Sequence, residues 1–328
     1  MSVFDHLAHA RFEFRIFRIP HPRLLRILEE ITILRDVGRR AREEWLARGR
    51  QGPRRPQKFL PIIGPTGMGK STCILHYRET VLAAERHDPE IHPFVHVTLN
   101  AQATIKRLGS DILSAYEDPD FEEGTASKLL RRAADHIDAA RTETLALDEI
   151  HHLINNDGSM SAHGGGKTAW SVTETIKRML IEGTCPLILI GTEHAEPLLM
   201  KNPQLKGRSY TPIFLSPLDA SIREEKDMFI EYCAGFDLKL VEHRIFERLS
   251  GLITGDIPGC MYDVSGGVFG TASSVFEVAA EIAIRRGGDG ITREDLSNAV
   301  RTWAIPLKYT DYNPFEGGPR RLRPGKAA

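Results

Sequence analysis

Residues 59–71 read FLPIIGPTGMGKS, and this short apolar run followed by a glycine-rich loop decides the fold. Residues 64–71 have the spacing G-x-x-x-x-G-K-S/T, which is typical of a loop that binds nucleotide phosphates. Gly67 and Gly69 let the backbone turn tightly, so that several N–H groups point at one phosphate cluster. The helix expected to begin near Ser71 adds the positive end of its dipole. The stretch therefore predicts a strand, a phosphate-binding loop and a helix.

The side chains of this loop suit ATP and Mg²⁺ as cofactors. Lys70 supplies a positive charge for the β- and γ-phosphates, and the Ser71 hydroxyl can ligate Mg²⁺. A chance glycine turn is the alternative, but it would not explain why the loop lies between an apolar strand and a helix. We expect nucleotide contacts from the whole loop and the residue after it: Gly64, Pro65, Thr66, Gly67, Met68, Gly69, Lys70, Ser71 and Thr72.

A second apolar run, residues 144–147, ends in two acids, Asp148 and Glu149. In a parallel sheet, carboxylates at the C-terminal end of a strand lie beside the phosphate loop. Asp148 is expected to hold the metal through water, and Glu149 to polarise the water that attacks the γ-phosphate. The pair therefore indicates ATP hydrolysis.

Two further residues are candidates for contact with the γ-phosphate. Thr192 follows the apolar run 186–190 and is expected to touch this phosphate or orient the water; an ordinary loop hydroxyl is the alternative. Arg208 precedes the last expected strand, where an arginine of a ring-forming ATPase reaches the nucleotide of the neighbouring subunit. Lys206 is the rival for this role, and a solvated basic turn is the plain alternative.

Apolar stretches alternate with helical stretches through the middle of the chain, which indicates a parallel sheet covered on both faces. The fold class is therefore α/β, with a five-stranded parallel sheet followed by a small all-helical domain. Strands are expected at 59–63, 94–99, 144–147, 186–190 and 210–215, and helices between them at 71–86, 104–116, 125–141 and 168–182. Four later helices are expected at 222–233, 242–252, 271–285 and 292–303.

The composition, with 41% hydrophobic and 27% charged residues in 328, allows about two domains and excludes a disordered chain. No apolar run approaches the roughly 20 residues needed to cross a bilayer, and the first residues lack the apolar core of a signal peptide. We therefore expect a cytoplasmic protein with no membrane partner. Four scattered cysteines indicate reduced thiols, not a disulfide framework or zinc site: Cys73, Cys185, Cys233 and Cys260.

Charge is unevenly distributed along the chain. The net charge is −1, yet residues 1–58 carry fourteen basic and seven acidic side chains. A basic arm on an acidic body favours contact with a polyanion or an acidic partner; a solvated helical face is the plain alternative. The expected domains are a basic helical extension with a linker (1–58), a nucleotide-binding domain (59–217), a helical lid (218–305) and a flexible basic tail (306–328).

Together these motifs resemble an AAA+ ATPase and, more narrowly, the TniB/TnsC family of transposon-encoded AAA+ ATPases. The resemblance covers about residues 20–305 and rests on four stretches, of which LDEIHHL is the most specific: residues 62–71, 147–153, 189–193 and 204–208. One departure lies at residues 264–271, VSGGVFGT, where many AAA+ proteins place a basic sensor and this chain has Thr271. His151 and His152 match the family; we interpret them as packing or hydrogen-bonding residues, because no further ligands lie at zinc spacing.

The resemblance implies a function that the motifs alone do not give. Members of the family bind ATP, form rings or filaments around double-stranded DNA, and link target-site selection to a DDE-type transposase. The implied partners are double-stranded DNA, further copies of this chain, a transposase and a target-selection protein, in a bacterial, nucleoid-associated setting. By position, the implied roles are ATP–Mg²⁺ binding and hydrolysis for Lys70, Ser71, Asp148 and Glu149, γ-phosphate sensing for Thr192 and a trans-acting finger for Arg208.

In such a filament the DNA-facing side would lie around the second strand and the helix after it. Lys106 and Arg107 would bind phosphates and Thr104 would donate a further hydrogen bond, with Lys167 in a glycine-rich loop as another candidate. These contacts would tolerate any sequence and weaken strongly with salt; an ordinary surface charge is the alternative for each.

Two other functions remain open. A helicase loader or replication-initiator-like switch, as in the IstB and DnaC groups, keeps the fold and changes the partner. A small-molecule P-loop kinase would need a second substrate pocket under a mobile lid, and the acids at 148–149 with the arginine near the fifth strand fit hydrolysis in an oligomer better.

Overall fold

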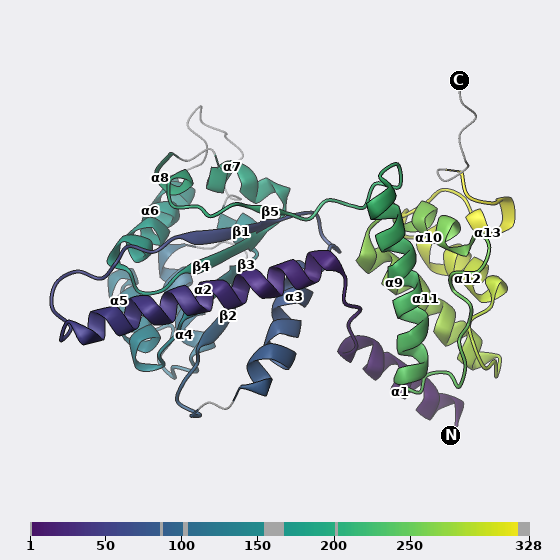
Figure 1. The fold of residues 1–328 in the computed structure, drawn as a ribbon, viewed down its shortest axis with the longest axis horizontal. Coiled ribbons are helices and arrows are strands. Elements are labelled where there is room, and N and C mark those ends of the chain that lie inside the picture. The colour runs from purple at the N-terminus through teal and green to yellow at the C-terminus, as the bar shows by residue number, and fades with distance from the viewer. Residues whose placement is uncertain (1, 86–87, 101–103, 154–166, 201–202, 321–328) are drawn as a thin grey trace. The chain divides into compact units, whose positions relative to one another are not determined.

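A computed structural model of the chain describes residues 2–85, 88–100, 104–153, 167–200 and 203–320, the side chains of 153, 167–172 and 204 excepted. The chain divides into two compact units (Figure 1). The α/β unit contains residues Arg26–Thr66 and Lys70–Leu215, and the helical unit contains Met1–Leu25, Gly67–Gly69 and Ser216–Ala328. The first 25 residues thus group with the C-terminal helices, although the sequence placed them in an extension of their own.

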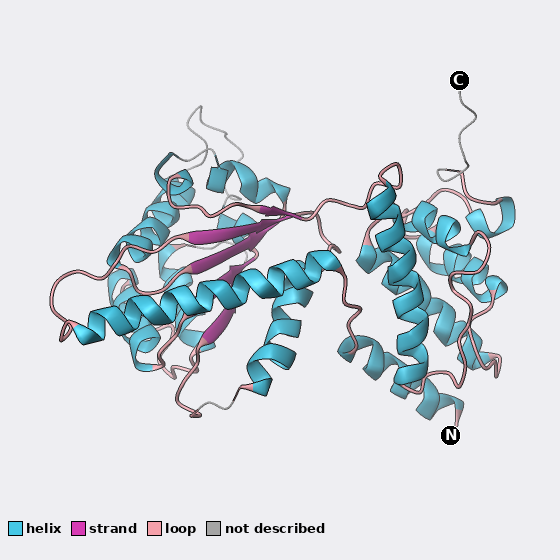
Figure 2. Ribbon diagram, in the orientation of Figure 1, coloured by secondary structure: helices cyan, strands magenta, loops and turns pink. Residues whose placement is uncertain are grey.

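The α/β unit is built on five parallel strands in the order β2-β3-β4-β1-β5, drawn in magenta in Figure 2. The predicted strands are confirmed, and the last is shorter than expected. This strand pairs with β1 in parallel register, but only at two residues. Pro212, just before them, has no backbone N–H to donate to β1. The strands are β1 (Phe59–Ile63), β2 (Phe94–Thr98), β3 (Thr144–Asp148), β4 (Leu187–Gly191) and β5 (Ile213–Phe214).

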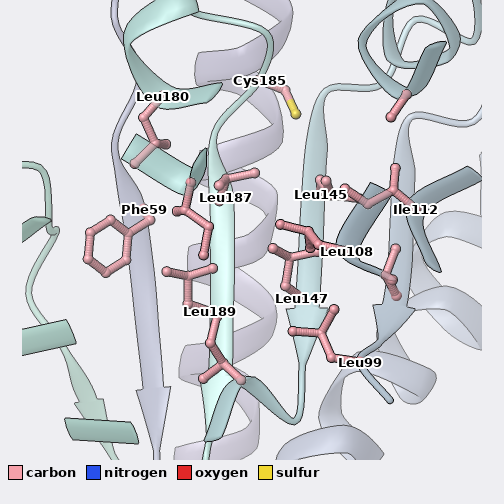
Figure 3. Close-up of a cluster of buried hydrophobic side chains, with 14 of the residues drawn as sticks. Phe59, Leu99, Leu108, Ile112, Leu145, Leu147, Leu180, Cys185, Leu187 and Leu189 are labelled. Carbon is pink, nitrogen blue, oxygen red and sulfur yellow. The ribbon is translucent and has the colours of Figure 1, made fainter. Parts of the chain in front are cut away.

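Helices cover both faces of this sheet, and alternate side chains of β1, β3 and β4 point to opposite faces of it. Leu145 and Leu147 of β3 join a cluster with helical residues such as Leu108 and Leu180 (Figure 3), whereas Ala146 between them is buried outside it. The helices are α2 (Pro22–Ala47), α3 (Lys70–Tyr77) with a π-helical segment (Arg78–Leu82), α4 (Ile105–Ala115), α5 (Ala126–Ala139), α6 (Lys167–Glu182), α7 (Glu196–Met200) and α8 (Pro203–Lys206).

Helix α2 is held against the rest of the α/β unit by a close backbone approach and by the ion pairs of the buried Arg35 side chain. A Cβ atom at Gly38 would lie 1.9 Å from the carbonyl oxygen of Glu143, so no larger residue fits there without movement. Three residues before it, Arg35 forms ion pairs of 2.8 Å with both Glu85 and Glu143. Burial alone would lower the pKa of Arg35, but its hydrogen bonds to Glu85 and Tyr77 outweigh burial and raise it.

The helical unit departs from the sequence prediction in several segments: α9 (Arg223–Glu242) continues past the end expected at 233, and α10 (Ile257–Ser265) was not predicted. A helix was expected at 242–252, but α9 ends at Glu242 and the chain then runs as a loop to α10. The carboxylate of Asp237 accepts hydrogen bonds from the backbone N–H groups of residues 250, 251 and 252 at 2.7, 2.7 and 3.0 Å. The buried carboxylate therefore pairs with backbone N–H groups of this loop, a segment that the apolar pattern predicted to be helical. The helices are α9 (Arg223–Glu242), α10 (Ile257–Ser265), α11 (Phe269–Arg285), α12 (Arg293–Ala299) and α13 (Pro314–Gly317).

The first and last described helices, α1 and α13, both pack within this unit. The sequence did not predict α1 (Val3–Ile16), which packs on α11 and whose Arg11 forms two hydrogen bonds of 2.7 Å with Glu281. The tail was expected to be flexible from residue 306, but Phe315 of α13 is buried and Tyr312 bonds to Asp263. These two aromatic side chains anchor the segment, although its high glycine and proline content had predicted a flexible tail.

Within the described residues, no single helix combines the length and apolarity needed to cross a membrane. Only α10 and α11 reach that threshold when taken together, and a bend of 118° separates them.

His21 makes the stability of the helical unit depend on pH. Burial, and secondarily the charge of Arg23, lower the pKa of His21 to about 4, and its Nδ1 accepts the backbone N–H of Leu24 at 3.2 Å. Unfolded histidine titrates near pH 6.5, so the unfolded state takes up the proton first, and stability is lost as pH falls below about 6.5. We expect a loss of about 2 kcal/mol from this group between about pH 7 and pH 5.

Urea unfolding at both pH values checks this expectation. The variant His21→Asn keeps a side-chain acceptor at the start of α2, so it separates titration from capping. The variant should lose about 2 kcal/mol less than the parent on acidification. Equal losses in the two proteins would show that His21 does not titrate as stated.

Candidate nucleotide site

The predicted phosphate-binding loop turns tightly at its glycines, as the sequence analysis expected. Gly67 and Gly69 adopt φ of +85° and +80°, values that favour glycine. Lys70 begins α3 and is 8% exposed, and its Nζ donates to the carbonyl oxygens of Gly64 and Pro65 at 2.7 and 2.8 Å. The ammonium group is thus held by two carbonyl oxygens of the loop, and phosphate oxygens can take their place as hydrogen-bond acceptors.

Three carboxylates act electrostatically on this ammonium group. Burial lowers the pKa of Lys70, and the negative charges of Glu149, Asp148 and Glu193 partly oppose that shift. Two of these acids were expected at the site, and Glu193 was not singled out as one of its charges. The only sequence signal that Glu193 belongs to the site was its position just after β4. The C-terminal ends of β3 and β4 lie at the same edge of the sheet, so Glu193 lies near the acids that follow β3.

Asp148 is the most enclosed acid of the site, with 2% of its surface exposed. Burial would raise its pKa, but hydrogen bonds from His96, Ser71 and the Glu149 backbone outweigh burial and lower it. The carboxylate is therefore ionised at neutral pH and adjoins the Ser71 hydroxyl. A hydroxyl and a carboxylate are the hard oxygen ligands that Mg²⁺ prefers, so the two residues fit the predicted metal role.

His96 was missed by the sequence analysis. Its Nε2 lies 3.3 Å from Oδ2 of Asp148, across the β2–β3 pair in which Thr98 is opposite Asp148. The sequence signal for His96 was its position as a polar residue inside the apolar run FVHVT. Its partner, Asp148, could not be predicted, because it depends on the order of the strands in the sheet. The contact fixes the orientation of the Asp148 carboxylate from the side opposite the loop.

Glu149 occupies an uncommon backbone conformation, with φ of +60°. Its side chain is 37% exposed, and Oε2 lies 3.2 Å from Nε2 of His151. Burial lowers the pKa of His151, and the neighbouring Glu149 charge opposes the shift. The candidate base is therefore accessible and already in contact with a second titratable side chain.

Thr192 and Arg208 lie at the C-terminal edge of β4 and next to β1, respectively. Oγ1 of Thr192 is 3.4 Å from Nδ1 of His194. The backbone of Arg208 is anchored to β1, because its carbonyl accepts the N–H of Phe59 at 3.0 Å, while its guanidinium has no partner among the described residues. The sensor and finger roles of these residues stay predictions.

The DNA candidates are dispersed around α4 and α6. Thr104 caps α4 by accepting the N–H of Arg107, and Lys106 is exposed. Arg107 forms ion pairs with Asp111 at 3.1 Å and Glu122 at 3.3 Å, so a phosphate would have to compete with two carboxylates for it. Lys167 begins α6, and its side chain lies outside what the structure describes.

The comparisons with known proteins agree with this architecture. Residues 54–199 match the family model described as AAA domain. No curated protein sequence matches the chain. The chain therefore contains a recognisable AAA domain, and the narrower resemblance to the TniB/TnsC family stays a prediction.

Several solved structures share the fold. Cdc6p from Pyrobaculum aerophilum has 17% identity and a TM-score of 0.56, over 88% of this chain and 70% of that one. The ORC1 protein of Aeropyrum pernix in complex with DNA has 21% identity and a TM-score of 0.52, over 81% and 64%. Drosophila ORC bound to DNA has 13% identity and a TM-score of 0.52, over 90% and 65%. The chain has the AAA+ fold and spans about two thirds of the length of these structures.

Proposed function

We propose that this protein is an ATP-hydrolysing AAA+ switch that assembles on double-stranded DNA. The observation that carries the proposal is the meeting of Lys70, Ser71, Asp148 and Glu149 at one edge of the parallel sheet, with Ser71 bonded to Asp148 and both acids acting on the Lys70 charge. This set supplies a phosphate ligand, two metal ligands and a base. A metabolite kinase would need a second substrate site, and among the described residues no observation points to one.

The residues divide the proposed reaction between them. Lys70 binds the β- and γ-phosphates with the loop N–H groups, and Ser71 and Asp148 hold Mg²⁺, which when bound offsets phosphate charge. Glu149 accepts a proton from the attacking water as the new oxygen–phosphorus bond forms and ADP leaves. Thr192 orients this water, and Arg208, unpaired among the described residues, reaches the nucleotide of a neighbouring copy.

Two cellular roles are compatible with such a switch. Likeness in fold to Cdc6p and to ORC proteins in complex with DNA supports a replication-initiator or helicase-loader role. The stretch LDEIHHL at 147–153 supports a regulator of transposition that links target selection to a DDE-type transposase. We place the initiator-like role first, and either role would be carried out in the cytoplasm at the nucleoid. Affinity capture with a replicative helicase and with a DDE transposase as baits separates the two.

ATP-dependent assembly on DNA is the direct test of the proposed function. Sedimentation with duplex DNA and a slowly hydrolysed ATP analogue should give large complexes, and negative-stain images should show rings or filaments. Lys70→Ala removes the phosphate ligand and should leave the protein unassembled under the same conditions. Assembly that is equal with and without nucleotide would contradict the proposal.

Salt dependence tests the DNA side of the same experiment. Lys106→Ala should weaken DNA binding and reduce the slope of log affinity against log salt by about one phosphate contact. Arg107→Ala should have a smaller effect, because Asp111 and Glu122 already engage its guanidinium. Unchanged affinity in both variants across a salt titration would remove α4 from the DNA interface.

A further inference from the structure

Beside the proposed Mg²⁺ ligands, three other side chains converge. One ligand atom each of Glu149, His151 and His152 lies within 4.8 Å of the other two. Nε2 of His151 is 3.2 Å from Oε2 of Glu149, and the two imidazole rings are tilted against each other with centroids 4.5 Å apart. His151 and His152 were interpreted from the sequence as packing or hydrogen-bonding residues, because Glu149, in the same tight turn, was not counted as a further ligand.

The backbone explains how so short a segment gathers three ligands. Glu149 has φ of +60°, which turns the chain sharply at the end of β3. A 3₁₀ turn, Ile150–Leu153, follows at once, and the N–H of His152 donates to the carbonyl of Glu149 at 2.9 Å. The turn therefore brings the side chains at positions 149, 151 and 152 to one side.

One atom of this cluster lacks a partner. Nδ1 of His151 is buried and has no hydrogen-bond partner among the described residues. A buried ring nitrogen without a partner is costly, and coordination of one imidazole nitrogen would allow the ring to reorient and satisfy the other. The cluster is thus incomplete as a hydrogen-bonded structure and suitable as a set of metal ligands.

We propose that Glu149, His151 and His152 bind a divalent transition metal ion of the Zn²⁺ class, at a site separate from the Mg²⁺ ligands Ser71 and Asp148. Two imidazoles with one carboxylate suit zinc and cobalt, whereas Mg²⁺ prefers oxygen ligands. Three protein ligands leave a coordination position for water. Small side-chain movements are enough to close the site, because the ligand atoms already lie within 4.8 Å.

Occupancy of this site would act on hydrolysis through Glu149. A carboxylate that coordinates a metal ion cannot accept the proton of the attacking water, so hydrolysis slows while Lys70 still binds ATP. This consequence rests on the proposed role of Glu149 as base, whereas metal binding itself does not. The site therefore makes the ATP-bound state longer-lived when the metal ion is present.

Binding is tested with Co²⁺ alone, on full-length protein without a histidine tag, nucleotide or Mg²⁺. Co²⁺ should give a visible d–d spectrum typical of nitrogen and oxygen ligands, with no thiolate band, since all four cysteines are buried elsewhere. His152→Ala should lower Co²⁺ affinity by about tenfold or more, and His151→Gln likewise. The matched control His92→Ala removes a histidine outside the cluster and should bind Co²⁺ as the parent does.

The outcomes separate this proposal from the proposed function. Equal Co²⁺ affinity in the parent and both cluster variants, each shown to be folded by circular dichroism, would overturn the metal site. If the variants lose Co²⁺ binding as stated, Zn²⁺ should slow ATP hydrolysis by the parent and have little further effect on His152→Ala. Cluster-dependent metal binding without such inhibition would overturn the regulatory consequence and count against Glu149 as base, while leaving the site itself established.

Discussion

Replacement of Glu149 by glutamine should lower the rate of ATP hydrolysis by about 10²–10⁴-fold while ATP binding remains intact. Glutamine has nearly the same shape as glutamate but cannot accept a proton from the attacking water. Lys70, Ser71 and Asp148 remain in place, and Asp148 keeps its hydrogen bond with the backbone N–H of residue 149 at 2.8 Å. Single-turnover phosphate release and titration with a fluorescent ATP analogue measure the two effects separately.

A nearby acid provides the matched control for this substitution. Glu196 begins α7, is exposed, and has no place in the proposed reaction, so Glu196→Gln should hydrolyse ATP at the parental rate. Assemblies of Glu149→Gln on DNA should persist after the parental assemblies have dissociated. Parental turnover by the Glu149 variant would show that another group accepts the proton.

Substitution of Gly38 by valine should destabilise the α/β unit by about 3–5 kcal/mol. The first side-chain atom would lie 1.9 Å from the Glu143 carbonyl oxygen and 3.0 Å from Pro186 Cδ. Relief of this overlap requires α2 to move away, which would break the Arg35 ion pairs with Glu85 and Glu143. Urea unfolding followed by circular dichroism measures the loss.

Two companion variants make this test specific. In an exposed helix, alanine is more favourable than glycine by about 1 kcal/mol, so Gly38→Ala should stabilise if helix propensity alone decided. The close approach of Gly38 to the Glu143 carbonyl predicts instead that Gly38→Ala destabilises the protein. Arg39→Val places a β-branched residue at the exposed neighbouring position and should cost less than about 1 kcal/mol. Equal effects at positions 38 and 39 would contradict the packing described for α2.

The sheet and the phosphate loop could be predicted because their signals are local. Each central strand is an uninterrupted apolar run, and the loop requires glycine at Gly67 and Gly69 whatever surrounds it. The acids at the end of β3 were predictable for the same reason, since parallel strands deliver their C-terminal ends to one edge. These elements needed no knowledge of long-range contacts.

The features that were missed depend on contacts between distant residues. The loop after α9 is set by Asp237, more than ten residues earlier, and apolar spacing at 242–252 does not reveal that interaction. His96 reaches Asp148 because β2 neighbours β3, and α1 is stabilised by Glu281 at the other end of the sequence. Periodicity reports which face of an element is apolar, and it does not report which element covers that face.

The packing of α1 on α11 also determines the order in which the protein matures during synthesis. Arg11 is translated 270 residues before its partner Glu281. The α/β unit is fully synthesised once Leu215 has emerged, whereas α1 must wait for α11 before it can pack. Helix α1 therefore stays without its docking surface while the whole α/β unit is made, and any chaperone acting on this chain has a long opportunity there.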